Sequence, residues 1–249
     1  INNVAIGAAS AEVTEMIYVD SSYGGGSSDG SVLAPYASLS TALTAKLVDT
    51  STTTYVFKLM PGTYTGHISI THTAQTQSFA IVGSGQDCTI IQGGASFAAG
   101  KDSNVLFFRR FNDVCIRDVT IRYGAYGWYP RDTRKCVVNN VRFTNLGSNG
   151  SVSDHDFTGT AQSQAAFWAS SSTSDGGAAR IRSSDEVQIS NCQVDYNLRG
   201  IRCQDSGSDA KTSMISNCRV YRNLESGIYL AAGGYSGASG CKNFLVTGN

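Results

Sequence analysis

The chain has little proline and little charge. Three prolines occur in 249 residues, and 19 basic residues balance 19 acidic ones. A net charge near zero gives no electrostatic reason to expect a nucleic acid or an anionic membrane surface as the partner. Apolar runs also stay well short of the ~20 residues that a membrane-spanning helix needs, so no membrane span is expected.

Cysteine is present, but not in the spacing of a metal site. The seven cysteines are an odd number, they are widely spaced, and no Cys-x-x-Cys motif occurs. Neither a zinc site nor a disulfide framework is therefore expected. We interpret Cys192 and Cys218, which occupy the same place in two similar segments, as small apolar residues of the core.

Those two segments are the strongest pattern in the sequence: "ISNCQVDYN" from Ile189 is followed by "ISNCRVYRN" from Ile215. An Asn or Asp precedes a short alternating segment at five places, with steps of 22, 51, 26 and 26 residues between them. A period of 22–26 residues that contains several short strands predicts a solenoid. We interpret the step of 51 as two periods, with the missing repeat near Phe167 in "AAFWAS". The five places are Asp118, Asn140, Asn191, Asn217 and Asn243.

Each repeat also predicts which residues face the core. Cys192 and Val194 are expected to point inward and Gln193 outward, because side chains alternate along a strand. Asn tolerates left-handed backbone angles, so the Asn before each strand predicts a sharp bend, and stacked bends predict an asparagine ladder. A second series of asparagines follows ~6 residues later in the repeats, at Asn145, Asn197, Asn223 and Asn249.

These repeats resemble the right-handed parallel β-helix of the pectate lyase and pectin methylesterase superfamily, a fold that phage tailspikes and other virion proteins share. The stretches "YVFKLMPGTYTGHISI" and "FAIVGSGQDCTIIQGG" resemble its first two coils. The resemblance implies an all-β fold, with residues 1–17 as a linker or entry segment and 18–249 as the β-helix domain. A short N-terminal capping helix is predicted from Leu39, Ala42, Leu43 and Leu47, with Ser38 or Ser40 at its start.

The resemblance does not extend to the methylesterase reaction. Those enzymes carry an aspartate nucleophile in an Asp-Thr-Leu stretch, and the matching place here reads Leu198-Arg199-Gly200. Methylesterase activity is therefore not expected.

A lyase that acts on acidic polysaccharide needs a base and cations that neutralise a uronate carboxylate. Alternation places Arg180 and Arg182 on the outside around Ile181, Arg202 outside between Ile201 and Cys203, and Tyr229 outside one coil later. Such a column of Arg and Tyr fits carboxylate or sulfate groups. The alternative is a solvated face on which the arginine stems cover apolar surface.

Two longer segments interrupt the repeat. Residues 122–135 contain Tyr126, Trp128, Tyr129 and Arg131, which are candidates for a sugar-stacking platform; the alternative is a loop whose aromatic rings pack back on the solenoid. Residues 145–164 contain Asp154, His155 and Asp156, a triplet that can supply an acid, a base or metal ligands. It resembles, over a short match, the Asp-Pro-His-Glu stretch of alginate epimerases.

Two classes of function remain open. The first is a tailspike-like virion or extracellular surface protein that binds cell-surface polysaccharide, expected as a homotrimer or with other virion proteins; the "FLVTGN" ending without a cap predicts that more chain or a partner covers the last coil. The second is a polysaccharide lyase or glycoside hydrolase. Its candidate catalytic residues are Arg180, Arg182, Arg202, Asp154 and His155. A hydrolase needs a pair of carboxylates, for which the candidates are Asp185, Glu186, Asp195, Asp205 and Glu225. No cofactor is expected, apart from Ca²⁺ in a lyase.

Overall fold

The computed structural model describes residues 14–49, 51–96, 104–147, 179–197, 199–204, 206, 211–223, 226–231 and 241–249. Within these ranges the chain forms short strands and one helix. No helix among the residues described is long and apolar enough to cross a membrane.

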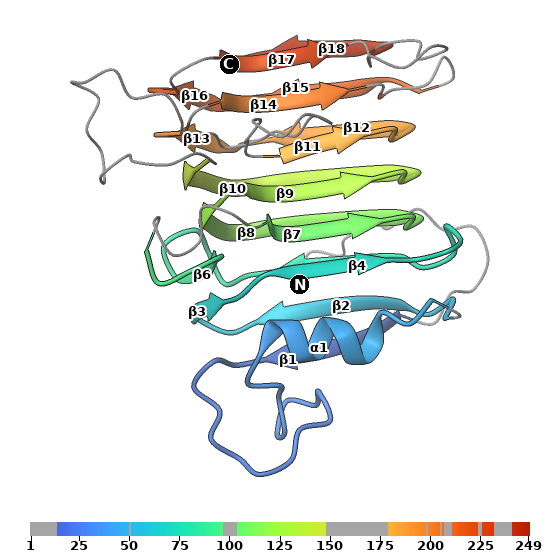
Figure 1. Ribbon diagram of the computed structural model, residues 1–249, viewed down its shortest axis with the longest axis vertical. Helices are drawn as coiled ribbons and strands as arrows, with labels where there is room; N and C mark the ends of the chain where they lie inside the picture. Colours follow the sequence, from blue (N-terminus) through green and yellow to red (C-terminus); the bar gives the residue numbers. More distant parts are fainter. Residues whose placement is uncertain are drawn as a thin grey trace.

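The strands stack in successive coils, and every strand pair is parallel (Figure 1). The first face of the stack has the order β1-β2-β5-β8-β10-β12-β15-β18. The bounds of these strands are β1 Thr14–Val19, β2 Thr54–Leu59, β5 Phe79–Val82, β8 Asp113–Gly124, β10 Lys135–Leu146, β12 Glu186–Ser190, β15 Ser213–Ser216 and β18 Phe244–Thr247.

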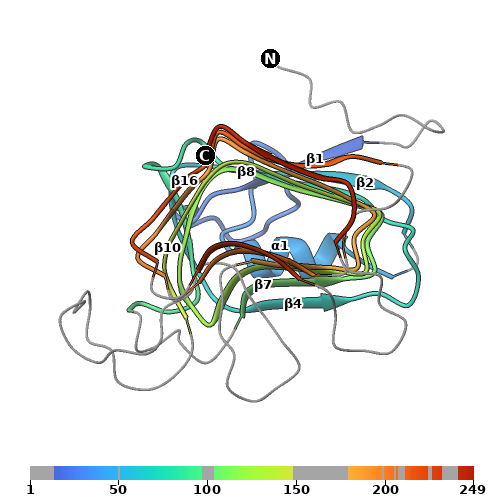
Figure 2. The same ribbon diagram turned by 90° about the horizontal axis from the view of Figure 1, so that it is seen from above.

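Two further faces complete each coil. Seen from above, the coils superimpose on a common outline, in which the first and third faces lie opposite each other and the second face joins them (Figure 2). The second face contains β3 Gly62–Thr65, β6 Thr89–Gln92, the later halves of β8 and β10, β13 Gln193–Asp195 and β16 Arg219–Tyr221. The third face contains β4 Ile68–Thr71, β7 Asn104–Arg109, β9 Tyr126–Arg131, β11 Ala179–Arg182, β14 Arg199–Gln204 and β17 Ser226–Ala231. The fold is therefore an all-β parallel β-helix, as the sequence predicts.

The bend between the first and second faces is where the sequence predicts left-handed residues. Asp118, Asn140, Asn191, Asn217 and Asn243 all have φ between 50° and 59°. The cost of this conformation is smallest for Asn and Asp, whose short polar side chains bond locally. The prediction of a bend at each of the five places is confirmed.

The step of 51 residues is one coil with an insertion, so the prediction of two periods was wrong. Strand β10 pairs directly with the next coil, with Asn139 opposite Ser190 and Arg142 opposite Gln193. Residues 147–178 therefore join the second face of one coil to the third face of the same coil. The proposed repeat around Phe167 falls within this connection and lies outside the described residues.

The buried asparagine ladder is formed mainly by the second series of asparagines. Asn197 is fully buried, accepts a hydrogen bond from the Leu146 amide at 3.1 Å, and donates to the Phe143 carbonyl at 3.1 Å. It also donates to Asn223 Oδ1 at 3.0 Å. In the first series, Asn140 Nδ2 donates to Asp118 Oδ1 at 2.7 Å, whereas Asn191 and Asn217 are exposed.

The core lies inside the coils, and a helix covers its N-terminal end. Cys192 and Cys218 are buried, as predicted, beside valine and isoleucine side chains. Helix α1 (Leu39–Lys46) begins after Ser38, whose side chain accepts a hydrogen bond from the Thr41 amide, and it buries Leu39, Ala42 and Leu43. Figure 2 shows α1 lying across the interior of the outline, so it shields the first coil from solvent.

Candidate functional site

The third face aligns the arginines and the tyrosine that the sequence singles out. Arg180 lies opposite Arg202, and Arg202 lies opposite Tyr229, on three successive strands. Ile181, Ile201 and Cys203 are fully buried, so the strand alternation that predicts this column is correct. The Arg202 guanidinium lies 5.0 Å from the centre of the Tyr229 ring, within the range of a cation–π contact.

A second column of arginines runs beside the first. Arg109 lies opposite Arg131, and Arg131 lies opposite Arg182, on β7, β9 and β11. Adjacent strands are ~4.8 Å apart, so three guanidinium-bearing side chains follow one another along the axis of the helix. We call the outer surface of the third face, turned toward the viewer in Figure 1, the arginine face. It is defined by Phe107, Arg109, Tyr129, Arg131, Arg182, Arg202 and Tyr229.

One carboxylate partly neutralises this column. Arg109 Nε lies 2.9 Å from Asp132 Oδ2, and Arg131 Nε lies 3.6 Å from the same oxygen. Asp132 has a left-handed φ of 55° at the bend after β9, which turns its side chain back toward the two arginines. Two arginines of the column, Arg109 and Arg131, share this one carboxylate, so Asp132 offsets only part of their combined positive charge.

The aromatic residues of the predicted platform divide between the core and the surface. Residues 126–131 form strand β9 and are not a loop, because Tyr126-Gly127-Trp128 continues the sheet between β7 and β11. Trp128 is fully buried, and its indole N–H points to Cys136 Sγ at 3.5 Å, so it cannot stack on a sugar. Its assignment to an exposed platform was wrong.

Tyr126 and Tyr129 stay on the outer side of β9. Their ring centres are 5.9 Å apart, and Tyr129 packs edge-on against Phe107 at 4.7 Å. Tyr129 is 9% exposed and Tyr229 is 50% exposed, so Tyr229 presents the larger open ring. The surface therefore offers aromatic contact at both ends of the column that contains Arg202.

Phe107 and Arg109 belong to this surface, although sequence reasoning did not select them. In β7, Leu106 and Phe108 are fully buried, and the residues between and after them face outward. The alternation in "NVLFFRR" carried this signal, but that stretch precedes the repeat on which the assignment was based.

Most of the predicted catalytic residues either lie outside the described residues or lie on other faces. Asp154 and His155 lie outside the described residues, as do Asp205 and Glu225, and the side chain of Arg180 is likewise not described. Glu186 lies on the first face, 2.9 Å from Lys135 Nζ, and Asp195 lies on the second face. Among the described residues, the carboxylate in contact with the arginine face is Asp132.

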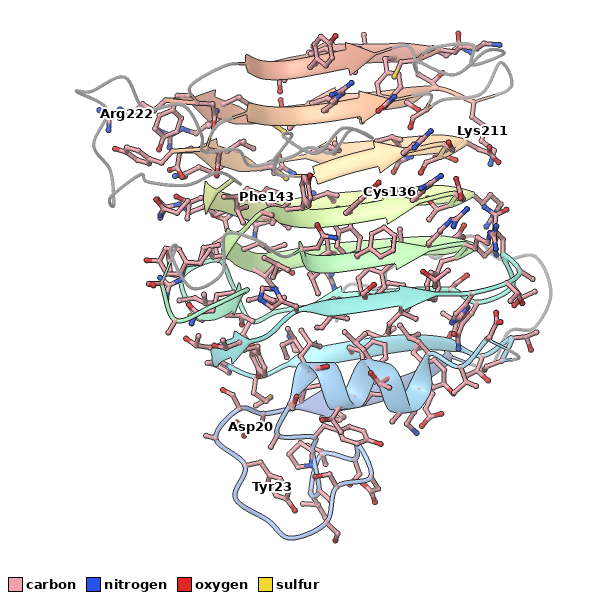
Figure 3. All side chains as sticks on the ribbon, in the orientation of Figure 1. Asp20, Tyr23, Cys136, Phe143, Lys211 and Arg222 are labelled. Carbon is pink, nitrogen blue, oxygen red and sulfur yellow. The ribbon has the colours of Figure 1, made fainter. Side chains whose placement is uncertain are left out.

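The thiol of Cys136, labelled in Figure 3, contacts Trp128 of β9 and is inert. Burial raises the pKa of Cys136 to about 12, so this thiol is protonated at neutral pH and cannot act as a nucleophile. No cluster of three or more histidine, cysteine or carboxylate side chains that could hold a metal ion occurs in the ranges described. The described side chains of the arginine face are therefore mainly cations and aromatic rings.

Comparison with known families agrees with this architecture. The family model of the right-handed beta helix region matches residues 103–249, more than half of the chain. The chain belongs to the right-handed beta helix family. No curated protein matches the sequence. The family membership accounts for the coil, and the chemistry of a β-helix protein resides in its outward-facing side chains.

Proposed function

We propose that this β-helix protein binds an acidic polysaccharide along the arginine face. The observation that supports the proposal is the alignment of Arg109, Arg131 and Arg182 on three successive strands, beside the column that contains Arg202 and Tyr229. A guanidinium presents several N–H donors in a plane and pairs with carboxylate or sulfate groups. A repeating anionic ligand matches a repeating row of such donors.

The proposed setting is a virion, as part of a tailspike-like protein, or another extracellular surface, with the β-helix as a homotrimer. This part of the proposal rests on the resemblance of the repeats to the β-helix fold that phage tailspikes and other virion proteins share. The second candidate is a lyase on the same face, because a lyase also needs cations that neutralise a uronate. Binding is favoured because Asp132 contacts both Arg109 and Arg131 and so orients two guanidinium groups, which donate hydrogen bonds and do not accept them.

The test uses acidic polysaccharides that differ in their anionic group. Binding of polygalacturonate, hyaluronan and heparin would be measured by biolayer interferometry against neutral dextran. We expect the Arg109→Met and Arg131→Met double variant to bind the preferred acidic chain at least ~10-fold more weakly, and added salt to weaken the binding of the wild type. Absorbance of an unsaturated uronate and new reducing ends, followed in the same samples, would reveal a lyase or a hydrolase.

Arg117→Met is the matched control. Arg117 lies on the first face, its side chain is as exposed as that of Arg109 at 29%, and it also pairs with a neighbouring aspartate. An equal loss of binding in this variant would mean that general charge, and not the arginine face, attracts the polysaccharide. Absence of binding to every acidic chain would overturn the proposal.

A further inference from the structure

A pocket of about 320 Å³ lies on a different side of the molecule from the arginine face. It opens over the second face, where Arg122 of β8 and Arg142 of β10 are outward residues on neighbouring coils. Other parts of the wall come from Gln86 and Asp87, in the turn after β5, from Thr144 of β10, and from Tyr196, in the bend after β13. None of these residues contributes to the arginine face.

The turn that forms one wall is held in place by hydrogen bonds. The Gly85 amide donates to the Asp118 carbonyl at 3.0 Å, and Thr120 Oγ1 donates to the Gln86 carbonyl at 2.7 Å. The Gln86 side chain donates to Asn140 Oδ1 at 3.0 Å. The turn is thus tied to both coils beneath it, so the pocket is formed before any ligand arrives.

Arg142 is fixed by a buried carboxylate. Asp195 is fully buried and accepts hydrogen bonds from Arg142 Nη2 at 3.0 Å and from Arg142 Nε at 3.4 Å. Tyr221 and Gln193 also donate to Asp195 Oδ2, at 3.0 and 2.6 Å. These contacts hold one edge of the guanidinium against the wall, so its orientation at the pocket is set in advance.

Arg122 differs from Arg142 because no carboxylate in the described part of the chain forms an ion pair with it. Its Nε donates to Gln92 Oε1 at 2.9 Å, and its guanidinium lies 4.7 Å from the centre of the Tyr123 ring. Both contacts orient the group without neutralising it. Arg122 therefore leaves a positive charge at the pocket that can pair with an anionic group.

We propose that this pocket binds one acidic sugar residue, with Arg122 as the partner of its carboxylate or sulfate group. The volume is of the size that encloses a small ligand. The Asp87 carboxylate can accept hydrogen bonds from sugar hydroxyl groups, the Thr144 hydroxyl can donate to them, and the Tyr196 ring offers an apolar contact. A free inorganic anion would pair with Arg122 but has no hydroxyl group to donate to Asp87, whose exposed carboxylate would then bind water.

The experiment uses D-glucuronate, D-glucose and sodium sulfate as probes of the whole chain, with binding measured by NMR titration. We expect saturable binding of glucuronate, with amide shifts at residues 86–87 and 196, and at least tenfold weaker binding by Arg122→Met. Arg117→Met should bind as the wild type does. Because the wild-type shifts locate the ligand without any substitution, the test does not depend on the folding of a variant.

Three outcomes would overturn the proposal. Glucuronate could fail to bind, its shifts could fall elsewhere, or sulfate alone could bind as tightly as glucuronate, which would identify a simple anion site. The proposal does not rest on the arginine face. A loss of polysaccharide binding in Arg109→Met with intact glucuronate binding, or the reverse, would separate the two sites.

Discussion

Residues 187–204 and 213–230 form the same part of two successive coils. Their shared residues lie at the bends and in the core: Val194 is opposite Val220, and Ile201 is opposite Ile228. The residues that differ include outward pairs, such as Gln193 and Arg219, and also a buried pair, Val187 and Ser213. Repetition of the sequence thus follows from repetition of the backbone path, because each coil must bend and pack at the same places.

The outward residues that differ between the two segments are complementary across the coils. Tyr221 donates to Asp195 Oδ2 at 3.0 Å, and Arg202 lies over the ring of Tyr229. If an aspartate stood in place of Tyr221, opposite Asp195, the two carboxylates would repel each other at the spacing of adjacent strands. The shared residues therefore build the coil, and the outward residues that differ make contacts between neighbouring coils.

The largest expected effect comes from the shared Gly-Ile pair. A Cβ atom on Gly200 would lie 1.8 Å from the carbonyl oxygen of Gly227 in the next coil, whereas a Cβ on Gly227 would meet only Val220 Cγ1, at 3.2 Å. We expect Gly200→Ala to lower the free energy of unfolding by at least the ~3 kcal/mol of severe overpacking, and Gly227→Ala to cost about 1 kcal/mol or less. Urea unfolding of both variants measures the difference.

If the two alanine variants were equally stable, the close approach of the coils at Gly200 would be contradicted. The comparison is sharp because both substitutions add the same methyl group to equivalent places in the repeat. Only the neighbour of that methyl group differs.

The next effect concerns the buried ladder. Asn197→Leu would leave the Leu146 amide and the Phe143 carbonyl without their side-chain partner. A buried polar group without a partner costs ~1–3 kcal/mol, so we expect a loss of about 3 kcal/mol in the free energy of unfolding. Asn197→Asp retains the acceptor for the Leu146 amide and should recover part of this loss. If chemical denaturation showed no change in the free energy of unfolding for Asn197→Leu, the asparagine ladder would not contribute to stability.

A smaller effect is expected at the exposed bend. Asn217 is exposed and has a φ of 53°, so Asn217→Leu adds the cost of a left-handed conformation, ~1–2 kcal/mol, and no buried unpaired group. Asn217→Gly relieves the strain and should be close to neutral. Thermal unfolding of the two variants checks this order. A loss as large as that of Asn197→Leu would show that the two asparagine series have the same role.

Local sequence predicted the coil well, because bends and strand alternation depend on neighbouring residues. Asn191 and Asn217 marked bends, and Ile181 and Ile201 set which arginines face outward. Contacts between coils were not predictable in this way. An insertion of about one period lengthens the sequence as much as an extra coil does. The step from Asn140 to Asn191 was therefore wrongly predicted to be two coils. The pocket depends on the packing of residues 83–88 over Thr120, a contact between segments far apart in the chain.

The smallest expected effect is a change in stability with pH, which depends on the contact between Tyr221 and Asp195. Burial raises the pKa of Tyr221 above its ordinary value of 10.0, and the hydrogen bond to the Asp195 carboxylate raises it further. The folded state thus holds the phenol proton more tightly than the unfolded state does. The stabilisation is fully present below the unfolded pKa and is lost as the pH rises through the folded pKa.

Urea unfolding of the wild type and of Tyr221→Phe, from pH ~8 to pH ~11, measures this contribution. The difference in stability between the two proteins should be constant at the lower pH values and should shift against the wild type above pH ~10, because only the wild type can ionise at this position. Tyr64, whose pKa is raised to about 12, is common to both proteins and cancels in the difference. A pH-independent difference would mean that the Tyr221 hydroxyl does not depend on Asp195, and the complementarity of the two coils would then rest on Arg202 and Tyr229 alone.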